Sequence, residues 1–164
     1  MDYSLSNKDI SKLFGGKVKV LTYKDLYNFD NINDLLEPYG VVVILYESKP
    51  NNGHWTLLFR RDNTMIEFFD SYGLLVDDEQ DYVDDEYKEQ LKENYRYLTQ
   101  LIYESPYELE YNPHTFQKAK SGVNTCGRWV VYRYRHKNMH IDDFYKALKG
   151  TKNKDQLMVR MVPV

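Results

Sequence analysis

The segment at residues 124–133 reads Asn-Thr-Cys-Gly-Arg-Trp-Val-Val-Tyr-Arg and holds the only cysteine of the chain. Trp129, Val130 and Arg133 recur at intervals of three and four residues, which predicts a helix. Either of the two residues before the cysteine can cap the start of this helix. The pattern therefore places Cys126 in the first helical turn.

A thiol in a first helical turn has favourable surroundings for losing its proton. The backbone N–H groups there lack helical partners, and the helix dipole favours an anion. A thiolate is such an anion, so we expect Cys126 to ionise more easily than a free thiol. Gly127 has no side chain, which leaves room for a substrate backbone to come close. The alternative is that Cys126 is a small buried core residue.

Two apolar segments upstream supply a base and an acid. Residues 53–59 read Gly-His-Trp-Thr-Leu-Leu-Phe, which predicts a strand with His54 at its head. Residues 65–73 read Met-Ile-Glu-Phe-Phe-Asp-Ser-Tyr-Gly, a second strand that ends in Asp70 and turn residues. If the strands form a hairpin, Asp70 can hold one imidazole nitrogen while the other faces a thiol, as in thiol hydrolases. Glu67 is a less favoured candidate for the role of Asp70.

These motifs resemble the adenain and SUMO-protease superfamily of cysteine proteases. The resemblance is greatest to maturation proteases of adenoviruses, virophages, polinton-like elements and large DNA viruses. It covers residues 41–133 and rests on Gly-His-Trp, Phe-Asp-Ser-Tyr-Gly and Gln…Thr-Cys-Gly-Arg in the family's order. It implies an α+β fold with a central mixed, largely antiparallel sheet, flanking helices and the nucleophile at a helix N-terminus. The chain order His, Asp, Cys argues against a papain-like fold.

The same resemblance assigns further roles near the nucleophile. Gln117 matches the glutamine that donates its side-chain amide to the oxyanion. It lies nine residues before Cys126, a longer gap than the family's, and a bulge at residues 118–122 would absorb the difference. Trp55 matches a tryptophan that lines the substrate channel, so cleavage after small residues such as glycine is expected. The family's second channel tryptophan has no counterpart, because the only other tryptophan is Trp129.

The function implied is that of a cysteine endopeptidase that processes viral capsid or precursor proteins with Cys126, His54 and Asp70. Two alternatives stay open: a ubiquitin-like-protein isopeptidase with the same three residues, and a non-catalytic binding module with a structural cysteine. We expect no cofactor and no metal. A disulfide-linked peptide activator is not expected either, because it would consume the only cysteine.

Composition limits the remaining classes. The chain has 164 residues, of which 42% are hydrophobic, and fits a single domain with its own core. A single cysteine excludes an internal disulfide and fits a reducing compartment, and the first residues lack a secretion signal. We therefore expect the virion and the host cell interior, with no secretion and no membrane contact. The net charge of −3 argues against strong nucleic-acid binding. A weak, salt-sensitive DNA contact remains open through Lys17, Lys19, Arg60, Arg61 and the basic residues of 128–137.

The expected layout is one cysteine protease domain at residues 1–164. Residues 1–39 would form a helical cover that walls the substrate groove, 40–137 the catalytic core, and 138–164 a C-terminal helix and a tail packed on the sheet. Apolar residues at helical spacing predict one helix over residues 87–102. The acidic residues 77–86 are expected to be a solvated loop and helix start. Residues 107–111 are expected to form a strand.

Overall fold

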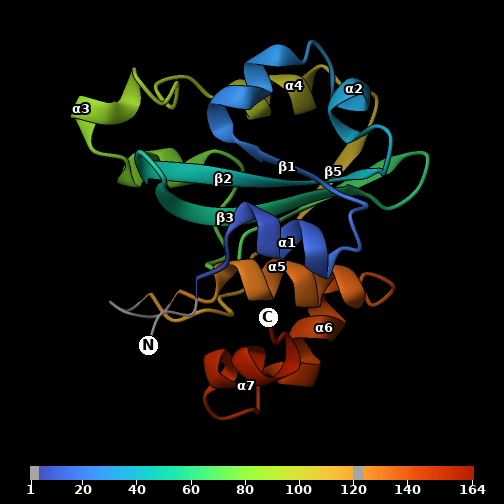
Figure 1. Cartoon of the computed structure of the whole chain (residues 1–164). Helices are drawn as coiled ribbons and strands as arrows, with labels where there is room; N and C mark the ends of the chain where they lie inside the picture. Colours follow the sequence, from blue (N-terminus) through green and yellow to red (C-terminus); the bar gives the residue numbers. More distant parts are fainter. Residues whose placement is uncertain (1–3, 120–123) are drawn as a thin grey trace.

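The computed structural model describes residues 4–119 and 124–164. Its centre is a five-stranded sheet in the order β1-β2-β3-β4-β5. The two inner pairings, β2 with β3 and β3 with β4, are antiparallel, and the edge strands β1 and β5 lie parallel to their neighbours. The expected mixed α+β architecture is confirmed (Figure 1). The strands span Lys19–Thr22 (β1), Val41–Lys49 (β2), Asn52–Arg60 (β3), Met65–Phe69 (β4) and Glu108–Tyr111 (β5).

The inner strand β2 is buried on both faces, as its run of β-branched residues predicts. Val41 and Val43 belong to the core cluster that also contains Trp129 of helix α5. Val42 and Ile44 belong to a second cluster on the opposite face. Because side chains alternate across a strand, one sheet separates two hydrophobic cores.

Helices cover both faces of the sheet (Figure 1). On one side lie α1 (Asn7–Leu13), α5 (Cys126–Arg135), α6 (Ile141–Leu148) and α7 (Lys154–Met161). On the other side lie η1 (Tyr23–Asn28), α2 (Ile32–Leu36) and α4 (Tyr97–Tyr103), while η2 (Asp78–Tyr82) and α3 (Asp85–Lys88) follow β4 in the chain. The predicted helix around the cysteine is α5, and Cys126 is its first residue.

The single helix predicted over residues 87–102 is wrong. The chain forms α3, then a turn, and then α4. Lys92 in the turn has φ 56°, in the left-handed region, which ends a right-handed helix. Leu91 and Leu98 are both buried although they belong to different elements, whereas Tyr95 between them is 53% exposed. Helical spacing was therefore produced by two separate inward-facing segments.

The structure adds detail at both ends of the chain. Residues 1–39 contribute not only helices but also β1, which lies beside β2 in the sheet. The tail expected from residue 155 is the helix α7, capped by Asn153, whose side chain accepts a hydrogen bond from the Gln156 N–H. The helix α7 contacts α5. Asp155 of α7 accepts hydrogen bonds from Thr125 Oγ1, at the start of α5, and from Trp129 Nε1.

Candidate active site

The hairpin of β3 and β4 brings His54 and Asp70 together. Phe69, the last residue of β4, pairs with Leu57, so Asp70 follows directly at the end of the strand. His54 Nε2 lies 2.9 Å from Asp70 Oδ1, and the Tyr72 N–H donates to the same oxygen at 2.8 Å. Asp70 is fully buried and His54 is 8% exposed. The imidazole is thus held at Nε2, which leaves Nδ1 for another partner.

The nucleophile reaches this pair because β4 is short. β3 continues beyond the pairing of Leu57 with Phe69, and its edge has no β4 partner at Trp55. The N-terminus of α5 fills that place, and the Trp55 N–H donates to Cys126 Sγ at 3.4 Å. Cys126 and His54 line the same cavity. Residues 54, 70 and 126, far apart in the sequence, therefore meet at one end of the sheet.

The electrostatics favour a charged pair between thiol and imidazole. Burial alone raises the pKa of Cys126, but the charge of His54 and hydrogen bonds from His54, Trp55 and Gly127 outweigh it and hold the pKa below its usual value. Burial alone lowers the pKa of His54, but Asp70 and Cys126 raise it well above its usual value. Burial likewise opposes the charge of Asp70, yet His54 holds that pKa below its usual value. The arrangement stabilises a thiolate beside an imidazolium.

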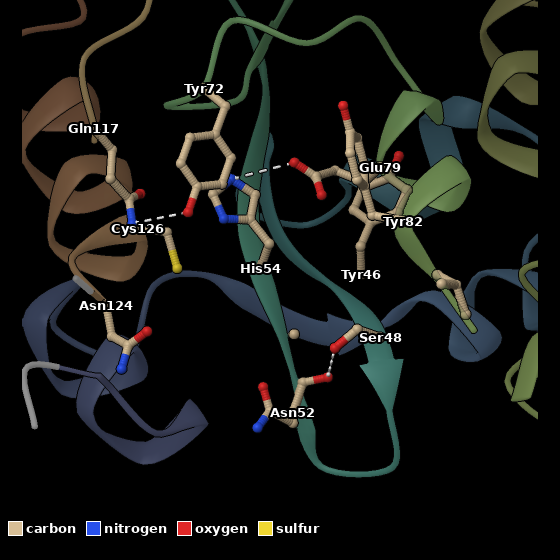
Figure 2. Close-up of a pocket in the computed structure, with 12 residues that line it drawn as sticks. Tyr46, Ser48, Asn52, His54, Tyr72, Glu79, Tyr82, Gln117, Asn124 and Cys126 are labelled. Carbon is tan, nitrogen blue, oxygen red and sulfur yellow. Dashed lines mark hydrogen bonds and ion pairs between the residues drawn. The ribbon is translucent and has the colours of Figure 1, made fainter. Parts of the chain in front are cut away.

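Gln117 lines the same cavity as His54 and Cys126. It is 1% exposed, its Oε1 accepts from Ser71 Oγ at 2.7 Å, and its Nε2 donates to Tyr72 Oη at 3.3 Å. Gln117, His54 and Cys126 together line a cavity of about 190 Å³ (Figure 2). The bulge expected at residues 118–122 falls largely on residues outside those described.

Tyr72 was missed by the sequence reasoning. Its ring stacks on His54 with centroids 4.5 Å apart, and its hydroxyl meets the Gln117 amide. The sequence signal was its place two residues after Asp70, in the turn that ends β4. Because Tyr72 lies in the turn that follows Asp70, its side chain lies near the histidine that Asp70 contacts.

Glu79 was also missed. Its Oε1 lies 3.7 Å from His54 Nε2, and its side chain points toward the imidazole (Figure 2). The pKa of Glu79 is raised to about 8: burial is the largest cause, His54 lowers the pKa, and Asp70 and Cys126 raise it. We expected it in a solvated acidic segment, but Val76 and Val83, spaced three and four residues from it, are buried and turn this part inward.

Trp55 and Gly127 contact the N-terminal segment. The Trp55 indole Nε1 donates to the Leu5 carbonyl at 3.0 Å. A Cβ built on Gly127 would lie 3.2 Å from both Leu5 and Trp55 side-chain atoms. In this structure the side chains that approach Gly127 closely are those of Leu5 and Trp55, and the substrate-binding role expected for Gly127 stays a prediction.

A larger cavity, of about 830 Å³, is also lined by Cys126. Its lining includes Ser4, Leu5, Trp55 and Asn124 as well. Residues from the N-terminal segment and from β3 therefore line one cavity together with the nucleophile.

Glu67, the other candidate acid, is occupied elsewhere. It is fully buried and accepts from Arg133 Nε at 2.9 Å and from Arg61 Nη1 at 2.8 Å. This ion pair removes Arg133 from the basic residues considered for DNA, since Arg133 is also fully buried. Arg128 is directed inward as well, toward the Val162 carbonyl.

Among the described residues, one group of side chains of the types that bind metals lies close together: His54, Asp70 and Glu79, with one possible ligand atom of each within 4.8 Å of the others. None of the helices within residues 4–119 and 124–164 combines the length and the apolar character that a membrane span requires.

Comparison with known proteins finds a relative of this chain and solved structures with a similar fold. Uncharacterized protein V9 of the Sputnik virophage is 41% identical over 143 residues, which cover 87% of this chain and 82% of V9. The chain belongs to the V9 family. No protein-family model matches it.

The fold of this V9 relative is that of a viral cysteine protease. A selenomethionine crystal structure of the ASFV pS273R protease superposes with a TM-score of 0.54 at 15% identity, over 97% of this chain and 66% of the other. A second structure of that protease gives a TM-score of 0.50 at 14% identity. The chain thus spans somewhat less than two thirds of the pS273R protease, and the likeness establishes the fold, a SUMO-protease-like cysteine protease fold.

Proposed function

We propose that the protein is a cysteine endopeptidase that processes viral capsid or precursor proteins, with Cys126 as nucleophile, His54 as base and Asp70 as orienter. The observation that carries this is that His54 and Cys126 line one cavity, while Asp70 behind them holds the imidazole at 2.9 Å and the pKa of the Cys126 thiol is lowered. A buried structural cysteine needs none of these features.

The reaction follows from the positions of these groups. The Cys126 thiolate attacks a peptide carbonyl and forms a tetrahedral oxyanion. His54 gives its Nδ1 proton to the leaving amine, which departs and leaves an acyl-enzyme. His54 then takes a proton from water, whose hydroxide hydrolyses the thioester and restores the thiolate. Asp70 keeps the imidazole oriented and stabilises its charge throughout.

Two donors are available for the oxyanion. One is the Cys126 backbone N–H at the start of α5, and the other is the Gln117 side-chain amide. That amide meets Tyr72 Oη at 3.3 Å, a long hydrogen bond that an oxyanion can replace. Loss of one such donor typically lowers the rate by about two to three orders of magnitude.

Trp55 and the N-terminal segment would form the substrate channel. The cavity of about 830 Å³ that they line is also lined by Cys126. Since an indole narrows the channel next to the nucleophile, small residues such as glycine would be accepted before the cleaved bond. Capsid or precursor proteins are the proposed substrates, in the virion and the host cell interior.

The test is cleavage of Gly-containing capsid peptides by the purified, reduced protein, with Cys126→Ala as comparison. A small residue at a helix start is tolerated, so the variant should stay folded and lose all cleavage. Cleavage that persists in Cys126→Ala contradicts the proposal. Faster release from a ubiquitin-like-protein conjugate than from peptides would favour the isopeptidase.

A substrate-free measurement separates an enzyme from a binding module. The rate of Cys126 alkylation by iodoacetamide at pH 7 should fall by about tenfold or more in His54→Ala, because the thiolate loses its cation. His114→Ala is the matched control, as His114 lies outside the cavity and pairs with Asp142. Equal rates in all three proteins would indicate a structural cysteine.

A further inference from the structure

Glu79 is held in place by the start of η2. Asp77 precedes this helix with φ 68°. Its Oδ1 accepts from Tyr46 Oη at 2.8 Å, and its Oδ2 accepts from the Thr99 N–H at 2.8 Å. These contacts tie η2 to β2 and α4, so the carboxyl group of Glu79, two residues later, has a fixed direction into the site.

Two buried carboxylate oxygens, one of Asp70 and one of Glu79, accept no hydrogen bond from the described residues. Asp70 Oδ1 is satisfied by His54 and Tyr72, but Asp70 Oδ2 has no hydrogen-bond partner among the described residues. Glu79 Oε1 has none either, and it lies 3.7 Å from His54 Nε2, beyond hydrogen-bond length. Buried polar atoms without partners are costly, and two carboxylates in one dry place repel each other. One proton shared between the two groups removes both costs.

We propose that Glu79 is a positioning residue in the protonated form, which donates a hydrogen bond to Asp70 Oδ2 and so keeps Asp70 charged and directed at His54. The proposed hydrogen bond from Glu79 does not depend on the proposed function; only its expected effect on peptide turnover does. The arrangement is a carboxylic acid, a carboxylate, an imidazolium and a thiolate in sequence. It extends the three proposed active-site residues by a fourth, which acts through Asp70.

The charges around Glu79 agree with this role. The pKa of Glu79 is raised to about 8, with burial as the largest cause, while hydrogen bonding to Glu79 helps to lower the pKa of Asp70. Below that pH Glu79 is neutral and donates. Above it Glu79 becomes a second anion beside Asp70 and the donor is lost. The other titratable groups that face it are His54, Cys126 and Tyr72, with Tyr46 and Tyr82 on the cavity wall.

The experiment measures Cys126 alkylation by iodoacetamide from pH 5 to 10 in the full chain. Wild type should show an inflection near pH 8 in addition to that of the thiol. Glu79→Gln keeps an N–H donor but cannot ionise, so this inflection should disappear. Glu79→Ala removes the donor, and its rate at pH 7 should fall by about tenfold, the typical effect of a lost hydrogen bond to a charged group. Glu79→Gln should recover most of that loss.

Asp81→Asn is the matched control, since it removes one carboxylate from the same helix at an exposed position paired with Arg96. It should alkylate as wild type does. An inflection near pH 8 that survives in Glu79→Gln overturns the proposal, and this variant decides the question even if Glu79→Ala does not fold.

Alkylation needs no substrate, so the result is independent of whether any peptide is cleaved. If peptides are cleaved, Glu79→Ala should lower kcat and leave KM unchanged, because the proposed role of Glu79 acts through Asp70 on the imidazole. A change confined to KM would instead indicate a role in the cavity wall and overturn the positioning role.

Discussion

The backbone N–H of Trp55 donates a hydrogen bond to the sulfur of Cys126 at 3.4 Å. In a longer hairpin this N–H would be free to bond a β4 carbonyl, but β4 ends at Phe69. The donor is instead directed at the sulfur, where it helps to lower the pKa of the thiol. The chemistry of the nucleophile is therefore linked to the length of a strand.

Replacing Asp70 by asparagine should remove turnover while substrate binding stays intact. The amide keeps the shape but favours the wrong imidazole tautomer and cannot stabilise the imidazolium, so kcat should fall by about 10⁴-fold. Steady-state kinetics on a cleavable peptide give kcat and KM separately. A kcat within twofold of wild type would show that another group orients His54. Glu67 is then not the replacement, because Arg133 and Arg61 hold it.

The activity should extend further to both acid and alkaline pH than free side chains would allow. The pKa of Cys126 is lowered despite its burial, so the thiolate forms at a pH below the usual value for a thiol. The pKa of His54 is raised despite its burial, so the imidazolium persists above the usual value for a histidine. In the pH profile of kcat/KM, the acidic limb should therefore lie at a lower pH than the usual pKa of a thiol, and the alkaline limb at a higher pH than the usual pKa of a histidine. Limbs at the ordinary pKa values of the two groups would contradict the charged pair.

Asp155→Ala should destabilise the start of α5, although Asp155 belongs to the separate helix α7. The carboxylate accepts from Thr125 Oγ1 at 2.6 Å, from Trp129 Nε1 at 3.0 Å and from the Lys118 N–H at 3.1 Å. Leaving these buried donors unpaired should lower the free energy of unfolding by about 2 to 4 kcal/mol. Urea denaturation measures this, with Asp143→Ala on the exposed face of α6 as the control. Equal midpoints in the two variants would mean that α7 does not support the nucleophile.

The reduced protein should cleave peptides without a disulfide-linked activator or DNA. Cys126 is the only cysteine, and Arg128 and Arg133 are buried, so fewer cations are available for a phosphate backbone than the sequence indicates. Any stimulation by DNA should be modest and should disappear between about 50 and 200 mM salt. Rates measured with and without duplex DNA across a salt series test this. An enzyme that is silent until DNA is added would contradict a preformed site.

Three of the residues proposed from the sequence lie at or next to the end of a regular element. His54 is the third residue of β3, Asp70 directly follows β4, and Cys126 is the first residue of α5. Hydrophobic periodicity locates such ends. The order of the three motifs along the chain then indicated the resemblance to the adenain and SUMO-protease superfamily.

Residues within irregular segments were harder to predict. Glu79 lies in a short 3-10 helix within an acidic run, where composition favours solvent, and its inward direction depends on the left-handed Asp77 and its contacts with Tyr46 and Thr99. The break between α3 and α4 likewise depends on one backbone conformation at Lys92 that no side-chain pattern reveals. The helix α7 is different, since Asn153 is a recognisable N-cap three residues before Gln156.

The buried pair of Glu67 and Arg133 joins the two halves of the site as a single rigid frame. Glu67 lies on β4 three residues before Asp70, and Arg133 lies on α5 seven residues after Cys126. Both side chains are shielded from water, so dissolved ions screen their attraction far less than they screen surface charges. The distance between orienter and nucleophile should therefore be insensitive to ionic strength, and on heating it should persist until the domain unfolds as a whole.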